Sequence, residues 1–145
     1  DIPTVVVDGV PVRVMMGSAF GITSPVRVFA DTLYVEAHLH AGQSITLPKA
    51  EERAVYVAQG HLKAGDTALP EHSMAIFSEG EGVVLQATEE SRIAIIGGEQ
   101  LGERFIEWNF VSSRKERIEQ AKRAWRERRF PTVPGDEIEF IPLPE

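Results

Sequence analysis

Short strand-like segments follow one another from Thr4 to about Val111, and this pattern constrains the fold more than any other feature. In each segment apolar residues alternate with polar ones or form a brief apolar run, and Gly, Pro, Asp or Glu separates it from the next. Examples are T-V-V-V, V-P-V-R-V-M-M, S-I-T-L-P, A-V-Y-V-A-Q, M-A-I-F, V-V-L-Q-A, R-I-A-I-I and F-I-E-W-N-F. Many short strands with Gly-rich turns predict an antiparallel β-sandwich or jelly-roll barrel, and 145 residues are typical of one domain.

Two local patterns give this prediction detail. Asp8-Gly9 stands between two apolar runs and favours a tight type I′ hairpin turn. Residues 33–40 alternate cleanly, so their side chains divide between two faces of one strand. Leu33, Val35, Ala37 and Leu39 form an apolar face that we expect to line the barrel, and Tyr34, Glu36, His38 and His40 form the opposite face.

The period changes after Val111. Ser113-x-x-Glu116 has the spacing of a capping box, and the following residues predict one amphipathic helix within 112–130, of about 15 residues, that ends before Pro131. We expect this helix to pack on a barrel formed by residues 1–111. Residues 131–145 contain four prolines among apolar side chains, which predicts an extended tail lying along a surface.

The composition excludes several functions. The chain has no cysteine, so disulfides, zinc-thiolate sites and thiol nucleophiles are ruled out. No apolar run approaches the roughly 18 residues of a membrane span. We therefore expect no membrane partner and a cytoplasmic location.

Charge is unevenly distributed along the chain. Residues 112–130 carry eight Lys/Arg and three Glu, a balance of +5, which leaves −12 for the rest of a chain whose net charge is −7. The basic side chains that could form an interaction surface are Arg114, Lys115, Arg117, Lys122, Arg123 and Arg126. Acidic residues are interleaved among them, so a solvated helix paired with its own acidic domain is the alternative. Nucleic acid is not an expected partner, because most of this surface would repel a polyanion.

Three stretches together resemble the C-terminal half of pirins, two-domain members of the cupin superfamily. They are V-R-V-M-M-G-S-A-F-G-I-T-S-P-V-R at 12–27, S-I-T-L-P-K-A-E-E-R-A-V-Y-V-A-Q-G at 44–60, and G-G-E-Q-L-G-E at 97–103 leading into W-N-F-V-S-S-R-K-E-R-I-E-Q-A-K-R-A-W. The resemblance covers nearly the whole chain and implies a cupin-type barrel with a closing helix. The opening D-I-P-T-V resembles the linker between the two halves, so we expect the metal-binding N-terminal cupin domain to be absent from this sequence.

The resemblance also implies a test for a metal in this half. Metal-binding cupins carry two or three His and one Glu that converge inside the barrel on iron, copper, nickel or a similar ion. The corresponding positions in this sequence are Pro48, Ala50, Arg53 and Ala75. Pro and Ala have no donor atom, and Arg is a permanent cation. We therefore expect a degenerate, metal-free barrel, with the transition metal held only by the N-terminal partner domain.

The pair His38-x-His40 does not restore that site. It lies one strand too early and belongs to the outer face of residues 33–40. Two interpretations remain: a pair of solvated histidines, or a weak surface site for zinc or nickel to which Glu36 contributes. His61 and His72 stand beside turn residues, and we expect both to be exposed loop residues.

No catalytic or cofactor-binding residue follows from these patterns. The resemblance implies that the complete protein is a quercetin 2,3-dioxygenase-type oxidoreductase, in which this half is the architectural partner of the metal-bearing cupin. Two alternatives are a protein-binding redox or transcription-regulator module and a stand-alone cupin without catalysis that forms a homodimer.

Overall fold

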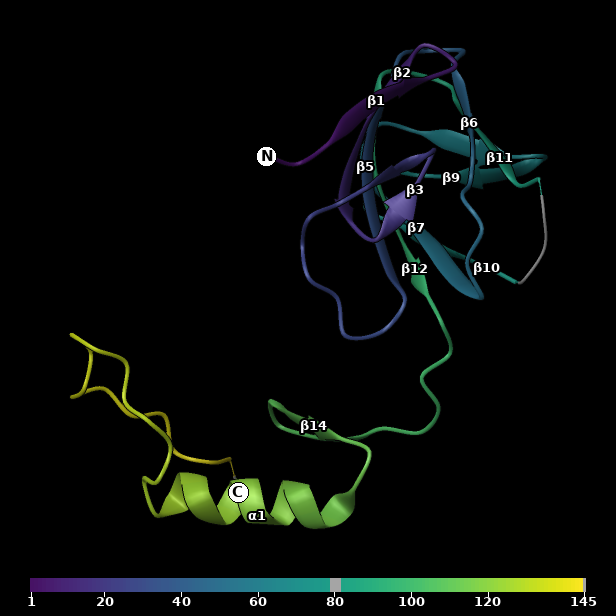
Figure 1. Ribbon diagram of the computed structural model, residues 1–145. Helices are drawn as coiled ribbons and strands as arrows, with labels where there is room; N and C mark the ends of the chain where they lie inside the picture. Colours follow the sequence, from purple (N-terminus) through teal and green to yellow (C-terminus); the bar gives the residue numbers. More distant parts are fainter. Residues whose placement is uncertain (79–81, 145) are drawn as a thin grey trace. The chain divides into compact units, whose positions relative to one another are not determined.

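The computed structural model shows two compact units, residues 1–100 and 101–145. The structure describes residues 1–78 and 82–144; residues 79–81 and the last residue of the predicted tail, Glu145, lie outside this part. Antiparallel strands dominate, and one helix follows them near the C-terminus (Figure 1). The predicted all-β class with a single C-terminal helix is confirmed. No helix in the described ranges is long and apolar enough to cross a membrane.

The larger sheet of the first unit has six antiparallel strands in the order β1-β2-β5-β12-β7-β10. These strands are β1 (Thr4–Val7), β2 (Val10–Met16), β5 (Thr32–Leu39), β7 (Glu52–Gln59), β10 (Met74–Phe77) and β12 (Ser91–Gly98). The smaller sheet has the order β6-β11-β8-β9, and a short ribbon pairs β3 with β4. Its strands are β6 (Ser44–Thr46), β8 (Leu62–Ala64), β9 (Thr67–Leu69) and β11 (Val84–Ala87), and the ribbon is β3 (Ser18–Ala19) and β4 (Ile22–Thr23).

The two sheets share one hydrophobic core. Val35, Val55 and Ile95 of the larger sheet and Ile45 and Leu85 of the smaller sheet are almost fully buried in the same cluster. Two sheets whose apolar faces pack against each other form the predicted sandwich. On β5 the polar residues occupy the outer face, whereas β10 and β12 also expose the apolar side chains of Ile76 and Ile96.

The two local predictions for this unit hold. Asp8 and Gly9 have φ angles of 50° and 81°, as a type I′ turn requires, and Val7 pairs with Val10 across it. Strand β5 shows strict alternation, with Leu33, Val35, Ala37 and Leu39 buried. The other face of β5 points away from the core, and this places His38 on the outside of the larger sheet.

The second unit begins with a hairpin where the sequence pattern predicts a single strand. F-I-E-W-N-F was predicted as one barrel strand, but it forms part of two strands, β13 (Phe105–Glu107) and β14 (Phe110–Ser112), which pair with each other. Trp108 has φ 54°, a left-handed conformation that reverses the chain between the strands. The hairpin contacts α1 (Lys115–Arg126), and both belong to the unit of residues 101–145.

Helix α1 lies within the predicted range 112–130 but begins without the predicted capping box. Arg114 is the N-cap residue and makes no side-chain capping bond, so the predicted Ser113/Glu116 capping box does not form. Instead, the backbone N–H of Arg114 donates to Ser112 Oγ at 3.2 Å. The helix ends before Arg128, which adopts a left-handed φ of 52°, and therefore well before Pro131.

The tail folds back on α1 within this unit. The Trp125 and Phe140 rings stack at 5.5 Å and 24°, and Trp125 Nε1 donates to the carbonyl oxygen of Ile141 at 2.8 Å. Phe110 and Phe130 stack in the same cluster at 5.9 Å. An isolated β-bridge between Val133 and Asp136 bends the otherwise extended segment. The packing of the helix on the barrel stays a prediction.

Candidate functional site

The four positions that correspond to cupin metal ligands lie in the first unit, around the start of β7. Pro48 and Ala50 belong to the connection between β6 and β7, Arg53 is on β7, and Ala75 is on the neighbouring strand β10. Ala75 pairs with Val55, and Phe77 pairs with Arg53, so Arg53 and Ala75 lie two positions apart along the paired strands. None of these four side chains carries a carboxylate, imidazole or thiolate, which are the groups that hold transition metals.

Arg53 gives this region a structural function. Its side chain is only 3% exposed, and its Nη1 donates to the carbonyl oxygen of Pro48 at 3.2 Å. The guanidinium thereby fixes the loop that carries two of the four positions. A guanidinium group offers only N–H donors and no lone pair, so the Arg53 side chain cannot serve as a metal ligand.

His38 and His40 come together on the outer side of the larger sheet, as their spacing predicted. His38 is on β5, and His40 follows directly after its last residue, Leu39. Their ring centroids are 5.2 Å apart, and the ring planes are tilted by 55°. His38 is half-buried, whereas His40 is exposed.

The predicted third member of this group, Glu36, is not part of it. Tyr34 Oη donates to Glu36 Oε1 at 3.1 Å, and Arg13 Nη1 donates to Glu36 Oε2 at 3.4 Å. The hydrogen bond to the carboxylate, together with partial burial and the negative charge of Glu36, raises the pKa of Tyr34 above its ordinary value of 10.0. Both oxygens of Glu36 therefore face partners away from the two histidines.

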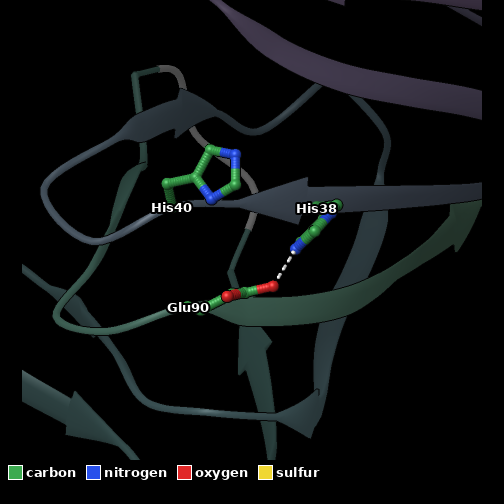
Figure 2. Close-up of side chains that lie close together, drawn as sticks. All are labelled: His38, His40 and Glu90. Atoms are coloured by element: carbon green, nitrogen blue, oxygen red, sulfur yellow. Dashed lines mark hydrogen bonds and ion pairs between the residues drawn. The ribbon is translucent and has the colours of Figure 1, made fainter.

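Glu90 takes the position that was predicted for Glu36. His38 Nε2 and Glu90 Oε1 form a hydrogen bond of 2.9 Å, drawn in Figure 2. One potential ligand atom each from His38, His40 and Glu90 lies within 4.8 Å of the other two. In the part of the chain that the structure describes, no other group of three or more His, Cys, Asp or Glu has this metal-site geometry. We call these three residues the His-Glu cluster.

The other two histidines are exposed loop residues, as predicted. His61 Nδ1 forms a hydrogen bond of 2.5 Å with Glu89 Oε1. His72 has φ 62° in the turn before β10. Glu89 and Glu90 thus pair with histidines from two different strand ends, although they are adjacent in the sequence.

The basic side chains of α1 divide into two groups. Lys122 forms ion pairs with Glu107 and Glu119, and the hydrogen bond with Glu107 contributes most to raising the pKa of Lys122 above 10.5. Lys115 Nζ lies 4.8 Å above the centroid of the Phe105 ring. The remaining predicted members are exposed, namely Arg114, Arg117, Arg123 and Arg126. Two of the six residues thus take part in the packing of the second unit.

An aromatic cavity of about 390 Å³ lies between α1, the hairpin turn and the tail. Trp108, Trp125, Phe130 and Phe140 contribute to its wall, and Arg128 lies 4.5 Å above the Phe140 ring. Trp108 packs edge-on against Trp125 in this local aromatic cluster.

Comparisons with known proteins agree on one family. The model of the pirin C-terminal cupin domain matches residues 34–131. A pirin-like protein of Caulobacter vibrioides is 46% identical over 138 residues, which are 94% of this chain and 48% of that protein. Human pirin is 34% identical over 130 residues, covering 83% of this chain and 45% of pirin.

A solved structure supports the same fold. The quercetin 2,3-dioxygenase from Acinetobacter baumannii superposes with a TM-score of 0.84 at 27% identity, over 92% of this chain and 49% of that protein. The chain thus spans about half the length of the relatives that it matches. The predicted pirin resemblance and the cupin fold are both confirmed, and we conclude that this chain belongs to the pirin family, within the cupin superfamily, and contains its C-terminal cupin domain.

Proposed function

We propose that this chain is the metal-free cupin half of a two-domain pirin-type protein and serves as the architectural partner of a metal-bearing N-terminal cupin. The observation that carries the proposal is the chemistry of Pro48, Ala50, Arg53 and Ala75, which offer no ligand atom for a transition metal. The buried guanidinium of Arg53 occupies the same region and donates a hydrogen bond to the carbonyl oxygen of Pro48. Relatives about twice as long as this chain support the presence of a second domain.

The complete protein is, in this proposal, a cytoplasmic oxidoreductase of the quercetin 2,3-dioxygenase type. The likeness to a quercetin 2,3-dioxygenase at 27% identity supports this substrate class. Iron, copper or nickel in the N-terminal domain would supply the redox-active centre that dioxygenation of a flavonol requires. This half supplies a barrel whose central strands β5, β7 and β12 are each eight residues long.

Quercetin turnover by two proteins tests the proposal. The two-domain protein and the 145-residue chain are each supplied with Fe²⁺, Cu²⁺ or Ni²⁺, and oxygen uptake and loss of quercetin are followed. We expect turnover from the two-domain protein and none from the chain alone. Turnover by the chain alone would overturn the proposal, as would stoichiometric metal retained by a chain that carries His38→Ala and His40→Ala.

A second candidate function is a protein-binding module that uses α1. The exposed side chains of Arg123 and Arg126 favour it, because they leave two cations of the helix facing solvent. This interpretation predicts salt-sensitive association with an acidic partner. Charge reversal by Arg123→Glu and Arg126→Glu should weaken that association, and unchanged affinity would exclude this surface. A homodimer, in which a second copy takes the place of the N-terminal cupin, is tested by light scattering, and a stable monomer at high concentration would exclude it.

A further inference from the structure

We propose that the His-Glu cluster, formed by His38, His40 and Glu90, binds one divalent transition-metal ion of the Zn²⁺, Ni²⁺ or Cu²⁺ class on the outer face of the larger sheet. This site is separate from the degenerate cupin positions and does not depend on the proposed function. Two imidazoles and one carboxylate are a ligand set that these borderline metals favour.

Strand register explains why the three residues meet. In the pairing of β5 with β12, Arg92 lies opposite His38, and Ser91 lies opposite Leu39. Continuing this register by one residue places Glu90 opposite His40. Residues opposite each other in an antiparallel pair direct their side chains to the same face, with Cβ atoms about 5 Å apart. Glu90 is therefore the direct neighbour of one histidine and the diagonal neighbour of the other.

The backbone that carries His40 is held in place by Gln43. The N–H of His40 donates to Gln43 Oε1 at 2.8 Å, and the N–H of Gln43 donates to the carbonyl oxygen of His40 at 3.0 Å. Gln43 Nε2 in turn donates to the carbonyl oxygen of Gly9 at 3.1 Å. These bonds fix the turn that follows β5, so that His40 stands on a defined element rather than on a loose loop.

The backbone that carries Glu90 is held by its buried neighbour Ser91. Ser91 is fully buried, and its Oγ bridges the carbonyl oxygens of His61 and Glu89 at 3.2 and 3.0 Å. The backbone of Gly60 packs directly against the carbonyl oxygen of Glu90. A ligand set on rigid backbone loses little conformational entropy when a metal binds.

The distances suit a metal after small side-chain rotations. Ligand atoms bonded to one tetrahedral zinc at about 2.1 Å lie about 3.4 Å from each other. The candidate atoms of the His-Glu cluster already lie within 4.8 Å, and His38 Nε2 and Glu90 Oε1 are only 2.9 Å apart. A metal would replace the proton shared by this pair. His40 and Glu90 are exposed, so water can complete the coordination from the solvent side.

Arg92 is the charge that opposes binding. It lies opposite His38 in the register and is exposed, so its guanidinium shares the outer face with the cluster. A positive charge several ångströms from a divalent ion weakens binding even through water. The geometry thus predicts that Arg92→Gln increases the affinity of the site, by about threefold at low ionic strength.

Isothermal titration of the whole chain with ZnCl₂, in a buffer that does not coordinate metals, tests the site. We expect one ion per chain, and His38→Ala, His40→Ala and Glu90→Gln should each weaken binding by about tenfold or more. Matched controls are Glu36→Gln, which changes the outer-face carboxylate outside the cluster, and His61→Ala, which removes an exposed histidine paired with Glu89. Both controls should bind as the unchanged chain does.

Copper provides a spectroscopic readout of the same site. The electron paramagnetic resonance spectrum of one bound Cu²⁺ should show coupling to two imidazole nitrogens, reduced to one in either histidine variant. Circular dichroism serves as the control that each variant remains folded. The proposal is overturned if His61→Ala lowers affinity as much as His38→Ala, if Glu90→Gln has no effect, or if Cu²⁺ shows no imidazole coupling.

Discussion

Gly60 and Glu90 approach each other so closely that residue 60 has no room for a side chain. A Cβ atom on residue 60 would lie 2.3 Å from the carbonyl oxygen of Glu90 and 2.9 Å from Ser91 Cα. Gly60 also has φ 80°, a left-handed conformation that other residues adopt only at a cost. The turn after β7 therefore supports the backbone at the base of the His-Glu cluster.

Substitution of this glycine should be strongly destabilising. We expect Gly60→Ala to lower the free energy of unfolding by about 2–5 kcal/mol, since backbone strain and a steric clash add together. Gly21→Ala is the matched control, because Gly21 has φ 78° but no atom within 4 Å of its would-be Cβ. Urea unfolding should show a loss of only about 1 kcal/mol for this control. Equal losses in the two variants would contradict the predicted clash.

Titration of Tyr34 should reveal its bond to Glu36. The carboxylate favours the neutral phenol and raises the pKa of Tyr34, so this contribution to stability is present below pH 10.0 and is lost as the pH rises through the folded-state pKa. Tyr56→Phe removes the other tyrosine, so that only Tyr34 titrates. In this background, Glu36→Ala should bring the pKa of Tyr34 back toward 10.0. Arg13→Ala should raise it further, because the charge of Arg13 lowers it. Ultraviolet difference absorbance measures both shifts. A higher pKa of Tyr34 in the Glu36→Ala variant would contradict the hydrogen bond with Glu36 as its cause.

The tail should detach when its contact with Trp125 is weakened. Trp125→Phe keeps a ring to stack on Phe140 but removes the hydrogen bond to Ile141, whereas Trp125→Ala removes both. We expect trypsin cleavage after Arg129 to accelerate several-fold in Trp125→Ala, with Trp125→Phe intermediate. Mass spectrometry identifies the fragment that begins at Phe130. Ile138→Ser is the control, because Ile138 is 96% exposed, and its cleavage rate should not change.

Truncation of the buried Arg53 should destabilise the protein more than replacement by a side chain of similar length. Arg53→Ala removes the donor to the Pro48 carbonyl and leaves a void, so we expect the free energy of unfolding to fall by about 2–4 kcal/mol. Arg53→Met fills most of the space and should lose roughly half as much. Denaturant unfolding compares the two variants. If both lose the same amount, packing contributes nothing measurable at this position.

Local patterns predicted the parts of the fold that short-range chemistry determines. The alternation of β5 identified its buried face, and Asp8-Gly9 identified a hairpin turn, because both depend on neighbouring residues alone. The helix start was placed wrongly, since Ser113 has the right residue type for a cap but Arg114 occupies that position. A single strand was predicted around Trp108, where the structure has a hairpin. The prediction failed because Trp108 adopts a left-handed φ, and tryptophan is not one of the residues that signal such a turn.

The composition of the candidate site depended on long-range pairing. His38-x-His40 is visible in the sequence, but Glu90 is 50 residues away from His40 and stands beside Glu89, which looks the same in sequence. Only the register of β5 with β12 distinguishes them, by directing Glu90 to the His38 and His40 side while Glu89 pairs with His61. Glu36 was the plausible neighbour by periodicity, but Arg13 from β2 engages it instead.

The aromatic cluster around Trp125 has a practical consequence for spectroscopy. Both tryptophans, Trp108 and Trp125, belong to residues 101–145, whereas both tyrosines, Tyr34 and Tyr56, belong to residues 1–100. Indole emission excited at the red edge therefore monitors the helical unit by itself, and phenol signals monitor the barrel. The chain carries a separate natural chromophore in each unit, so melting of the two can be followed in one sample without a label.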